Sequence, residues 1–165
     1  MEVTKVDIRH LDAFKVYADE CINDGLALYD SAENAHEVYL KKRIAYAQGR
    51  ELPEGWPPIS MFFCIESGVI LGAIRIRRGT TDYIENIIGQ IGYETLPKAR
   101  GRGIATFMLN WMKKHIMKDA CIVSCDADNL ASRKVIEKSG GQFLSCFYSQ
   151  EEGREVLRYQ LKPAQ

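Results

Sequence analysis

The sequence lacks several features that would assign it to a special class of protein. No apolar run in its 165 residues approaches the roughly 20 residues that a transmembrane helix needs. The first ten residues, MEVTKVDIRH, are charged where a signal peptide would have an apolar core. Neither sign of charge is in excess, since 22 Lys and Arg residues balance 22 Asp and Glu residues. Because binders of nucleic acid or anionic membranes need a basic excess, we expect a cytoplasmic protein that binds neither.

Cysteine and histidine are too scattered to indicate a metal site. The chain has five cysteines and three histidines. Only Cys121 and Cys125 lie close together, and they fall on a segment that is predicted to be a strand. A zinc site needs a compact set of such ligands with a turn between the paired ones. We therefore expect reduced thiols, as is usual in the cytoplasm, and no metal.

The residues that are present fit a single domain over residues 1–165, which is long enough to bury a core. The hydrophobic pattern alternates between periods typical of helices and of strands. Predicted helices cover residues 11–28, 31–48, 104–117 and 129–139, and predicted strands cover residues 3–8, 61–66, 69–77, 87–95, 120–125, 142–148 and 155–160. Ser31 is expected to cap the second helix, and Ser67-Gly68 to form a hairpin turn.

The order of these elements predicts the fold class. The strand–helix–strand unit over residues 87–125 requires a right-handed crossover between parallel strands, whereas the hairpins on either side are antiparallel. We therefore predict an α+β fold. It has a mixed, mostly antiparallel central sheet with helices on both faces and one parallel strand–helix–strand unit.

The most informative stretch is Arg100-Gly101-Arg102-Gly103-Ile104-Ala105, between a predicted strand and a predicted helix. Glycine allows the backbone to turn tightly and to approach a ligand. The first N–H groups of a helix have no partner within it, and the helix dipole favours negative charge there. With two arginines beside them, these residues predict a binding site for a pyrophosphate.

A dinucleotide-binding fold is a rival interpretation of the same glycines. Gly101 and Gly103 supply two of the three glycines of that fingerprint, and Asp126 ends the next strand, where a ribose-binding acid would lie. The third glycine position is Thr106, however, and residues 96–99 separate the strand from the glycines. These departures disfavour a nucleotide-dependent oxidoreductase.

A second motif, Asn129-x-x-Ser132-x-x-x-x-Glu137-x-x-Gly140-Gly141, follows the next predicted strand. In the first motif, Arg100, Gly103 and Ala105 occupy the fixed places of the pattern Arg/Gln-x-x-Gly-x-Gly/Ala. With both motifs in this order, the chain resembles the GNAT superfamily of acetyl-coenzyme A-dependent N-acetyltransferases, over roughly Met61 to Tyr148. It is most similar to a branch of predicted acetyltransferases that carry the second motif.

This resemblance implies acetyl-CoA as the co-substrate and assigns its parts by position. The backbone of Tyr93, Glu94 and Thr95 corresponds to the strand edge that binds the pantetheine arm. Asn129 and Ser132 correspond to residues that line the thiol end. The residues that would hold the pyrophosphate are Arg100, Gly101, Arg102, Gly103, Ile104 and Ala105.

The catalytic groups are less well defined by the resemblance. Many relatives carry a tyrosine as proton donor where this sequence has Ile136, which cannot donate a proton. Ser132 is our first candidate for the donor, with Tyr148 and Cys125 as alternatives. Glu94 is the candidate base, unless strand alternation points it away from the substrate, and a chain of water molecules is the alternative.

The activity that the resemblance implies is transfer of an acetyl group to a primary amine of a small-molecule or peptide acceptor, by direct attack on the thioester. Peptide N-termini, amino acids, polyamines and antibiotics all stay open as acceptors. We expect their contacts to come from the N-terminal helices, the loop of Trp56 and the hairpin at residues 148–155. A non-catalytic acyl-CoA-binding or regulatory module is the alternative function, and a homodimer stays open as the assembly.

Overall fold

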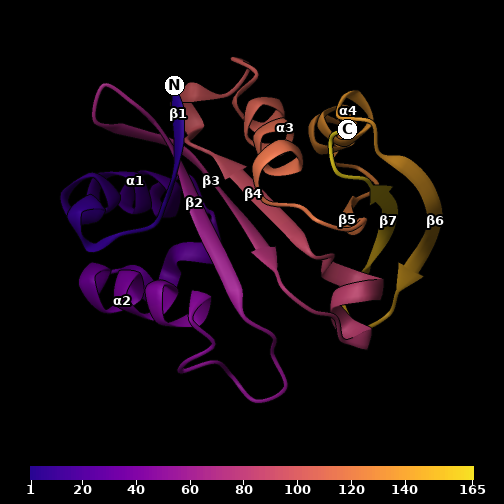
Figure 1. The fold of residues 1–165 in the computed structure, drawn as a ribbon, viewed down its shortest axis with the longest axis horizontal. Coiled ribbons are helices and arrows are strands. Elements are labelled where there is room, and N and C mark those ends of the chain that lie inside the picture. The colour runs from indigo at the N-terminus through magenta and orange to yellow at the C-terminus, as the bar shows by residue number, and fades with distance from the viewer. The chain divides into compact units, whose positions relative to one another are not determined.

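A computed structural model describes residues 1–165 (Figure 1). Its helices are α1 (Leu11–Asn23), α2 (His36–Ala47), α3 (Ile104–His115) and α4 (Leu130–Lys138). Its strands are β1 (Glu2–Lys5), β2 (Ile59–Glu66), β3 (Val69–Arg77), β4 (Ile91–Thr95), β5 (Cys121–Asp126), β6 (Gln142–Ser149) and β7 (Arg154–Leu161). The strands follow the order β1-β2-β3-β4-β5-β7-β6 in a seven-stranded sheet. The predicted mixed α+β class is confirmed.

The chain forms two compact units, which we describe in turn. Unit 1 contains Met1–Arg78 and Tyr93–Ile104, and unit 2 contains Gly79–Gly92 and Ala105–Gln165. The boundary passes through β4, so that its last residues belong to unit 1 and its first residues to unit 2. That residues 1–165 act as one domain stays a prediction.

Unit 1 is built around the β2–β3 hairpin. Ser67 and Gly68 form its turn with φ values of +50° and +77°, as Ser67-Gly68 predicted. Strand β1 pairs with β2 in the antiparallel direction. Helix α1 packs on β3 and α2 packs on β2, and the two helices lie side by side (Figure 1). Phe14 of α1 is fully buried, and its ring contacts those of Tyr29, Tyr39 and Phe63. An aromatic core therefore joins these elements.

Helix α1 is shorter than the predicted helix over residues 11–28. It ends at Asn23 because Gly25 adopts a left-handed φ of +88°. The N–H groups of Gly25 and Leu26 donate to the carbonyls of Ile22 and Cys21, which satisfies carbonyls that the helix end would leave free. Gly25 is a local stop signal that the apolar periodicity of the segment obscured.

The start of α2 and the end of β1 also differ from the prediction. Ser31 does not cap α2, since it lies in a short 3-10 helix over Ala27–Ala32 and α2 begins only at His36. Strand β1 ends before Ile8, because the Asp7 side chain accepts a hydrogen bond from the N–H of Arg9 and so starts another 3-10 helix. At Asp7 a polar side chain thus competes with regular structure over a few residues.

Strand β4 begins later than predicted, at Ile91. Residues Ile84–Ile88 instead form one turn of π-helix, and Gly89 follows with a φ of +73°. A Cβ on Gly89 would lie 2.9 Å from both the carbonyl oxygen of Ile122 and the amide nitrogen of Ser124. Only glycine lets this turn approach β5 so closely.

Unit 2 contains the parallel pair that the strand–helix–strand pattern predicted. Ile91 of β4 is in parallel register with Val123 of β5, and Gln90 exchanges two hydrogen bonds with the backbone of Ile122. Strand β7 pairs in the antiparallel direction with β5 and with β6, as the C-terminal hairpin predicted. No helix in the structure is both long and apolar enough to span a membrane.

Candidate active site

The predicted pyrophosphate site begins where β4 ends. Pro97–Ala99 form a 3-10 turn, Arg100 is extended, and α3 starts at Ile104. Gly101 and Gly103 adopt φ values of +80° and +77°, and a Cβ on either one would meet no atom within 4 Å. These two glycines are therefore required by the backbone conformation and not by packing, and they face open space that is available to a ligand.

Each cation of this loop is paired with an acid of unit 1. Lys98 Nζ lies 2.8 Å from Glu20 Oε1, Arg100 lies 2.9 Å from Asp24 Oδ2, and Arg102 lies 2.7 Å from Glu66 Oε2. The hydrogen bond from Arg102 lowers the pKa of Glu66 below its ordinary value. The three basic side chains are all at least half exposed. We refer to the three contacts as the loop ion pairs, and their exposure makes them weak and exchangeable.

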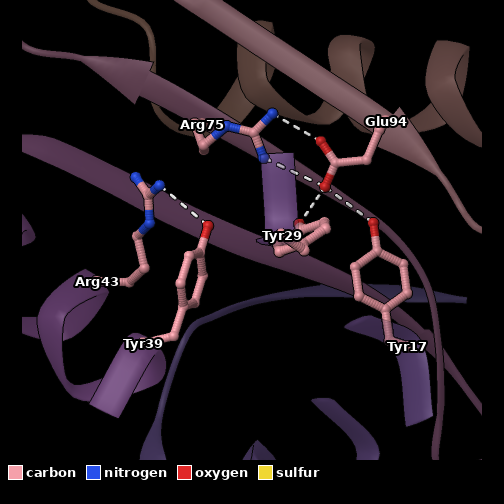
Figure 2. Close-up of polar contacts among 6 residues, drawn as sticks. All are labelled: Tyr17, Tyr29, Tyr39, Arg43, Arg75 and Glu94. Carbon is pink, nitrogen blue, oxygen red and sulfur yellow. Dashed lines mark hydrogen bonds and ion pairs between the residues drawn. The ribbon is translucent and has the colours of Figure 1, made fainter. Parts of the chain in front are cut away.

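Glu94, on the last part of β4, has the opposite environment. Its side chain is only 10% exposed and Arg75 of β3 only 7%, and their Oε2 and Nη2 atoms lie 2.6 Å apart. Glu94 Oε1 accepts further hydrogen bonds from Arg75 Nη1 at 3.2 Å, from the Tyr17 hydroxyl at 2.9 Å and from the Tyr29 hydroxyl. Figure 2 shows the carboxylate pointing toward all three partners. We call Glu94, Arg75, Tyr17 and Tyr29 the Glu94 centre.

Electrostatics fixes the protonation states of this centre. Burial raises the pKa of Tyr17 and Tyr29 well above the ordinary value of 10.0, and the charge of Glu94 raises it further. Burial alone would lower the pKa of Arg75, but the Glu94 carboxylate outweighs it and holds that pKa above its ordinary value. Both tyrosines are therefore neutral donors and Arg75 is a cation at physiological pH.

In unit 2, the second motif begins α4. The Asn129 side chain caps the helix by accepting a hydrogen bond from the N–H of Ser132 at 3.1 Å. The Ser132 side chain lies near the thiol of Cys125. Burial raises the pKa of Cys125 to about 11, although Arg133 and Ser132 oppose the shift. The thiol therefore keeps its proton at neutral pH, next to the predicted donor Ser132.

The end of α4 explains the two closing glycines of this motif. Gly140 has a φ of +90°, and the N–H groups of Gly140 and Gly141 donate to the carbonyls of Glu137 and Ile136. A Cβ on Gly141 would lie 2.5 Å from Cγ2 of Ile136, which is fully buried. Ile136, where the family resemblance implies a tyrosine, thus packs in the core.

In unit 2, a pocket of about 260 Å³ lies between the loop that follows β5 and the turn of the β6–β7 hairpin. It is lined by Ala127, Asp128, Gly153, Arg154 and Glu155. Arg154 forms ion pairs with Asp126 and Glu152 at 2.6 and 3.1 Å. Tyr148 lies on β6 in the same unit with 60% of its surface exposed. This region was expected to contact the acceptor.

The structure places the predicted site residues in both units. Tyr93, Glu94 and Thr95 lie on β4 in unit 1, together with the loop from Arg100 to Ile104. Asn129 and Ser132 are brought together in unit 2, and Tyr148 lies there too. Arg75 and Tyr17 are additions that sequence reasoning missed, and Tyr29, a plausible substrate contact from the sequence, is instead buried against Glu94. The one signal was an arginine inside the mostly apolar β3.

A family model for the acetyltransferase (GNAT) family matches residues 26–141, well over half of the chain. The chain belongs to this family. This family match confirms the predicted family and, as a family property, the predicted acetyltransferase activity. A comparison with curated proteins gave no match.

Several solved structures share the fold at low sequence identity. A complex of RimL, a ribosomal L7/L12 alpha-N-protein acetyltransferase, with coenzyme A has a TM-score of 0.72 at 15% identity, covering 99% of this chain and 94% of that one. A GNAT family acetyltransferase from Bacillus cereus reaches 0.67 at 20% identity, with 99% and 98% covered. Spermidine N-acetyltransferase SpeG from Vibrio cholerae reaches 0.64 at 13% identity, with 99% and 95% covered.

Proposed function

We propose that the protein transfers an acetyl group from acetyl-CoA to a primary amine. The loop from Arg100 to Ile104 carries this proposal, because two glycines of positive φ face open space at the start of α3 and two exposed arginines lie beside them. The structural neighbours support it, since RimL is described with coenzyme A and SpeG is named for the amine spermidine. The acceptor here is a small-molecule or peptide amine.

In this proposal acetyl-CoA supplies an activated acetyl group as a thioester. Tyr93, Glu94 and Thr95 hold the pantetheine arm through their backbone, and Asn129 and Ser132 line the thiol end. The pyrophosphate is held by Arg100, Gly101, Arg102, Gly103, Ile104 and Ala105. No set of three or more His, Cys, Asp or Glu side chains that could bind a metal is present, and the proposed reaction needs none.

The bond changes set what the protein has to provide. The amine nitrogen bonds to the acetyl carbon, the carbon–sulfur bond breaks, and the proton that the amine loses balances the one that the thiolate gains. Ser132 is our donor to the sulfur, with Tyr148 and Cys125 as alternatives. Cys125 keeps its proton at neutral pH beside Ser132, so both side chains have a proton to donate.

The proposal also covers the organisation of the chain. The family match over residues 26–141 includes parts of both units, which supports a single catalytic domain over residues 1–165. We place the reaction in the cytoplasm. The pocket lined by Asp128, Arg154 and Glu155 is our candidate contact region for the acceptor.

Gly103 provides the sharpest test of cofactor binding. Asp and Asn both tolerate a positive φ, and space is open at this position. Gly103→Asp and Gly103→Asn therefore differ mainly in charge. We expect calorimetry to show that the Asp variant binds CoA at least about tenfold more weakly than the Asn variant, because a carboxylate repels the phosphates. Equal affinities would place the phosphates elsewhere.

Turnover is tested with peptides, amino acids, polyamines and aminoglycosides while free thiol is measured. We expect amine-dependent release of CoA, and a loss of roughly ten- to a hundredfold in Ser132→Ala, as is typical for removal of one proton-transfer group. A fully active Ser132→Ala beside an inactive Tyr148→Phe would assign the donor to Tyr148. Tight binding of acetyl-CoA without turnover of any amine would favour the regulatory module.

A further inference from the structure

The Glu94 centre does not have the properties of a general base. Glu94 accepts four hydrogen bonds, three at Oε1 from Arg75, Tyr17 and Tyr29, and one at Oε2 from Arg75. The Glu94 side chain is only 10% exposed, and a proton taken from an amine would neutralise the charge that these donors stabilise. It would also leave the guanidinium of Arg75 buried without its anion, which is unfavourable.

The Glu94 centre connects β4, the strand that we propose to bind the pantetheine arm, to the rest of unit 1. Tyr17 comes from α1, Tyr29 from the 3-10 helix that follows it, and Arg75 from β3. Their donors converge on the Glu94 side chain (Figure 2), and Glu94 stands between Tyr93 and Thr95 in the sequence of β4. Three separate elements therefore fix the position of this short strand.

We propose that Glu94 is a positioning residue and not the base. Arg75, Tyr17 and Tyr29 act through it to hold the backbone of Tyr93–Thr95 in the geometry that binds the pantetheine arm. This inference rests on the proposed function and changes its chemistry. Because the Glu94 carboxylate is held by Arg75 and the two tyrosines, the acceptor amine loses its proton to water. No carboxylate of this centre then controls the rate.

Tyrosine variants test the proposal more safely than a change at Glu94, since Glu94→Gln would leave Arg75 buried without an anion. Tyr17→Phe and Tyr29→Phe each remove one donor to Oε1 and keep the ring. Tyr39→Phe is the matched control. Tyr39 is also buried, but its hydroxyl accepts a 3.0 Å hydrogen bond from Arg43 and makes none to Glu94 (Figure 2).

Three readouts decide the outcome. We expect Tyr17→Phe and Tyr29→Phe to bind CoA several-fold more weakly and to raise KM for acetyl-CoA more than they lower kcat. The amides of β4 should exchange hydrogen faster, and the pH profile of kcat/KM should not move. Tyr39→Phe should match the parent in all of these. A merely structural role would leave CoA affinity unchanged in the folded variants.

Two results would overturn the proposal. If Glu94 were the base, removing a hydrogen bond to the reacting carboxylate would change the pH profile of kcat/KM in Tyr29→Phe. Unchanged CoA affinity in both tyrosine variants would equally remove the positioning role. Failure of the proposed function is distinguishable, because the parent protein itself would then bind no CoA or acetylate no amine.

Discussion

Unit 1 uses the same kind of contact, an ion pair, in two opposite ways. The Arg75–Glu94 pair is almost fully buried and has two tyrosine hydroxyls bonded to it. The loop ion pairs, such as Arg100–Asp24, are exposed and have no further donors. Buried pairs lose most when one partner is removed, whereas exposed pairs contribute little. One set fixes the fold, and the other leaves its cations free to exchange partners.

This difference separates residues that build the site from residues that meet the ligand. A cofactor phosphate can replace Asp24 at Arg100 at small cost, because both side chains are already partly in water. No ligand can replace Glu94 at Arg75 without exposing a buried charge. We therefore expect changes in the Glu94 centre to appear first in stability, and changes in the loop ion pairs to appear first in CoA affinity.

The largest effect should come from Arg75. Arg75→Met leaves Glu94 buried without its cation, and we expect it to lower the free energy of unfolding by about 3–5 kcal/mol. Arg100→Met, the matched exposed change, should cost less than about 1 kcal/mol. Unfolding in urea measures both. Equal losses in the two variants would contradict the distinction between the buried and the exposed pairs.

High pH should weaken the buried centre selectively. The pKa values of Tyr17 and Tyr29 are raised in the folded state, so that above pH 10 the native protein retains protons that the unfolded chain releases. The contribution of these two tyrosines to the free energy of unfolding is therefore fully present below pH 10. Above pH 10 the free energy of unfolding falls by about 1.4 kcal/mol per pH unit for each tyrosine.

The control for this pH dependence is the double variant Tyr17→Phe/Tyr29→Phe. Other groups that titrate in the same range, such as Tyr83 and Tyr159, are present in both proteins and cancel in the difference. Thermal unfolding between pH 8 and roughly 11.5, chosen to bracket the ordinary tyrosine pKa, should show the parent losing its advantage over the variant. Parallel curves would mean that the two hydroxyls are not buried donors.

The parts of the molecule that follow from local sequence could be predicted. Ser67-Gly68 forms the expected hairpin turn, Gly140-Gly141 ends α4, and Asn129 begins it. Each of these signals acts within a few residues and needs no tertiary partner. The same holds for the loop at Gly101 and Gly103, whose positive φ values require glycine.

The Glu94 centre could not be predicted, because its partners are distant in sequence. Tyr17 and Tyr29 bond to Glu94 across 77 and 65 residues, and the pattern of α1 classes Tyr17 simply as a residue of the apolar face. By residue type alone, Glu94 is a candidate base. Only the three-dimensional arrangement shows that its carboxylate is buried against four hydrogen-bond donations, which is a matter of tertiary pairing and not of spacing.

The smallest expected effect concerns the loop ion pairs and cofactor affinity. Asp24→Asn removes a negative charge beside Arg100, so CoA phosphates should bind roughly two- to fivefold more tightly at low salt, as expected for one exposed charge in high dielectric. Asp12→Asn on α1 is the control, since it makes the same change in charge about 18 Å away along the helix. At about 1 M salt, where screening acts within about 3 Å, the gain should vanish. Weaker binding by Asp24→Asn in calorimetry would show instead that Asp24 orients Arg100 for the phosphate and does not compete with it.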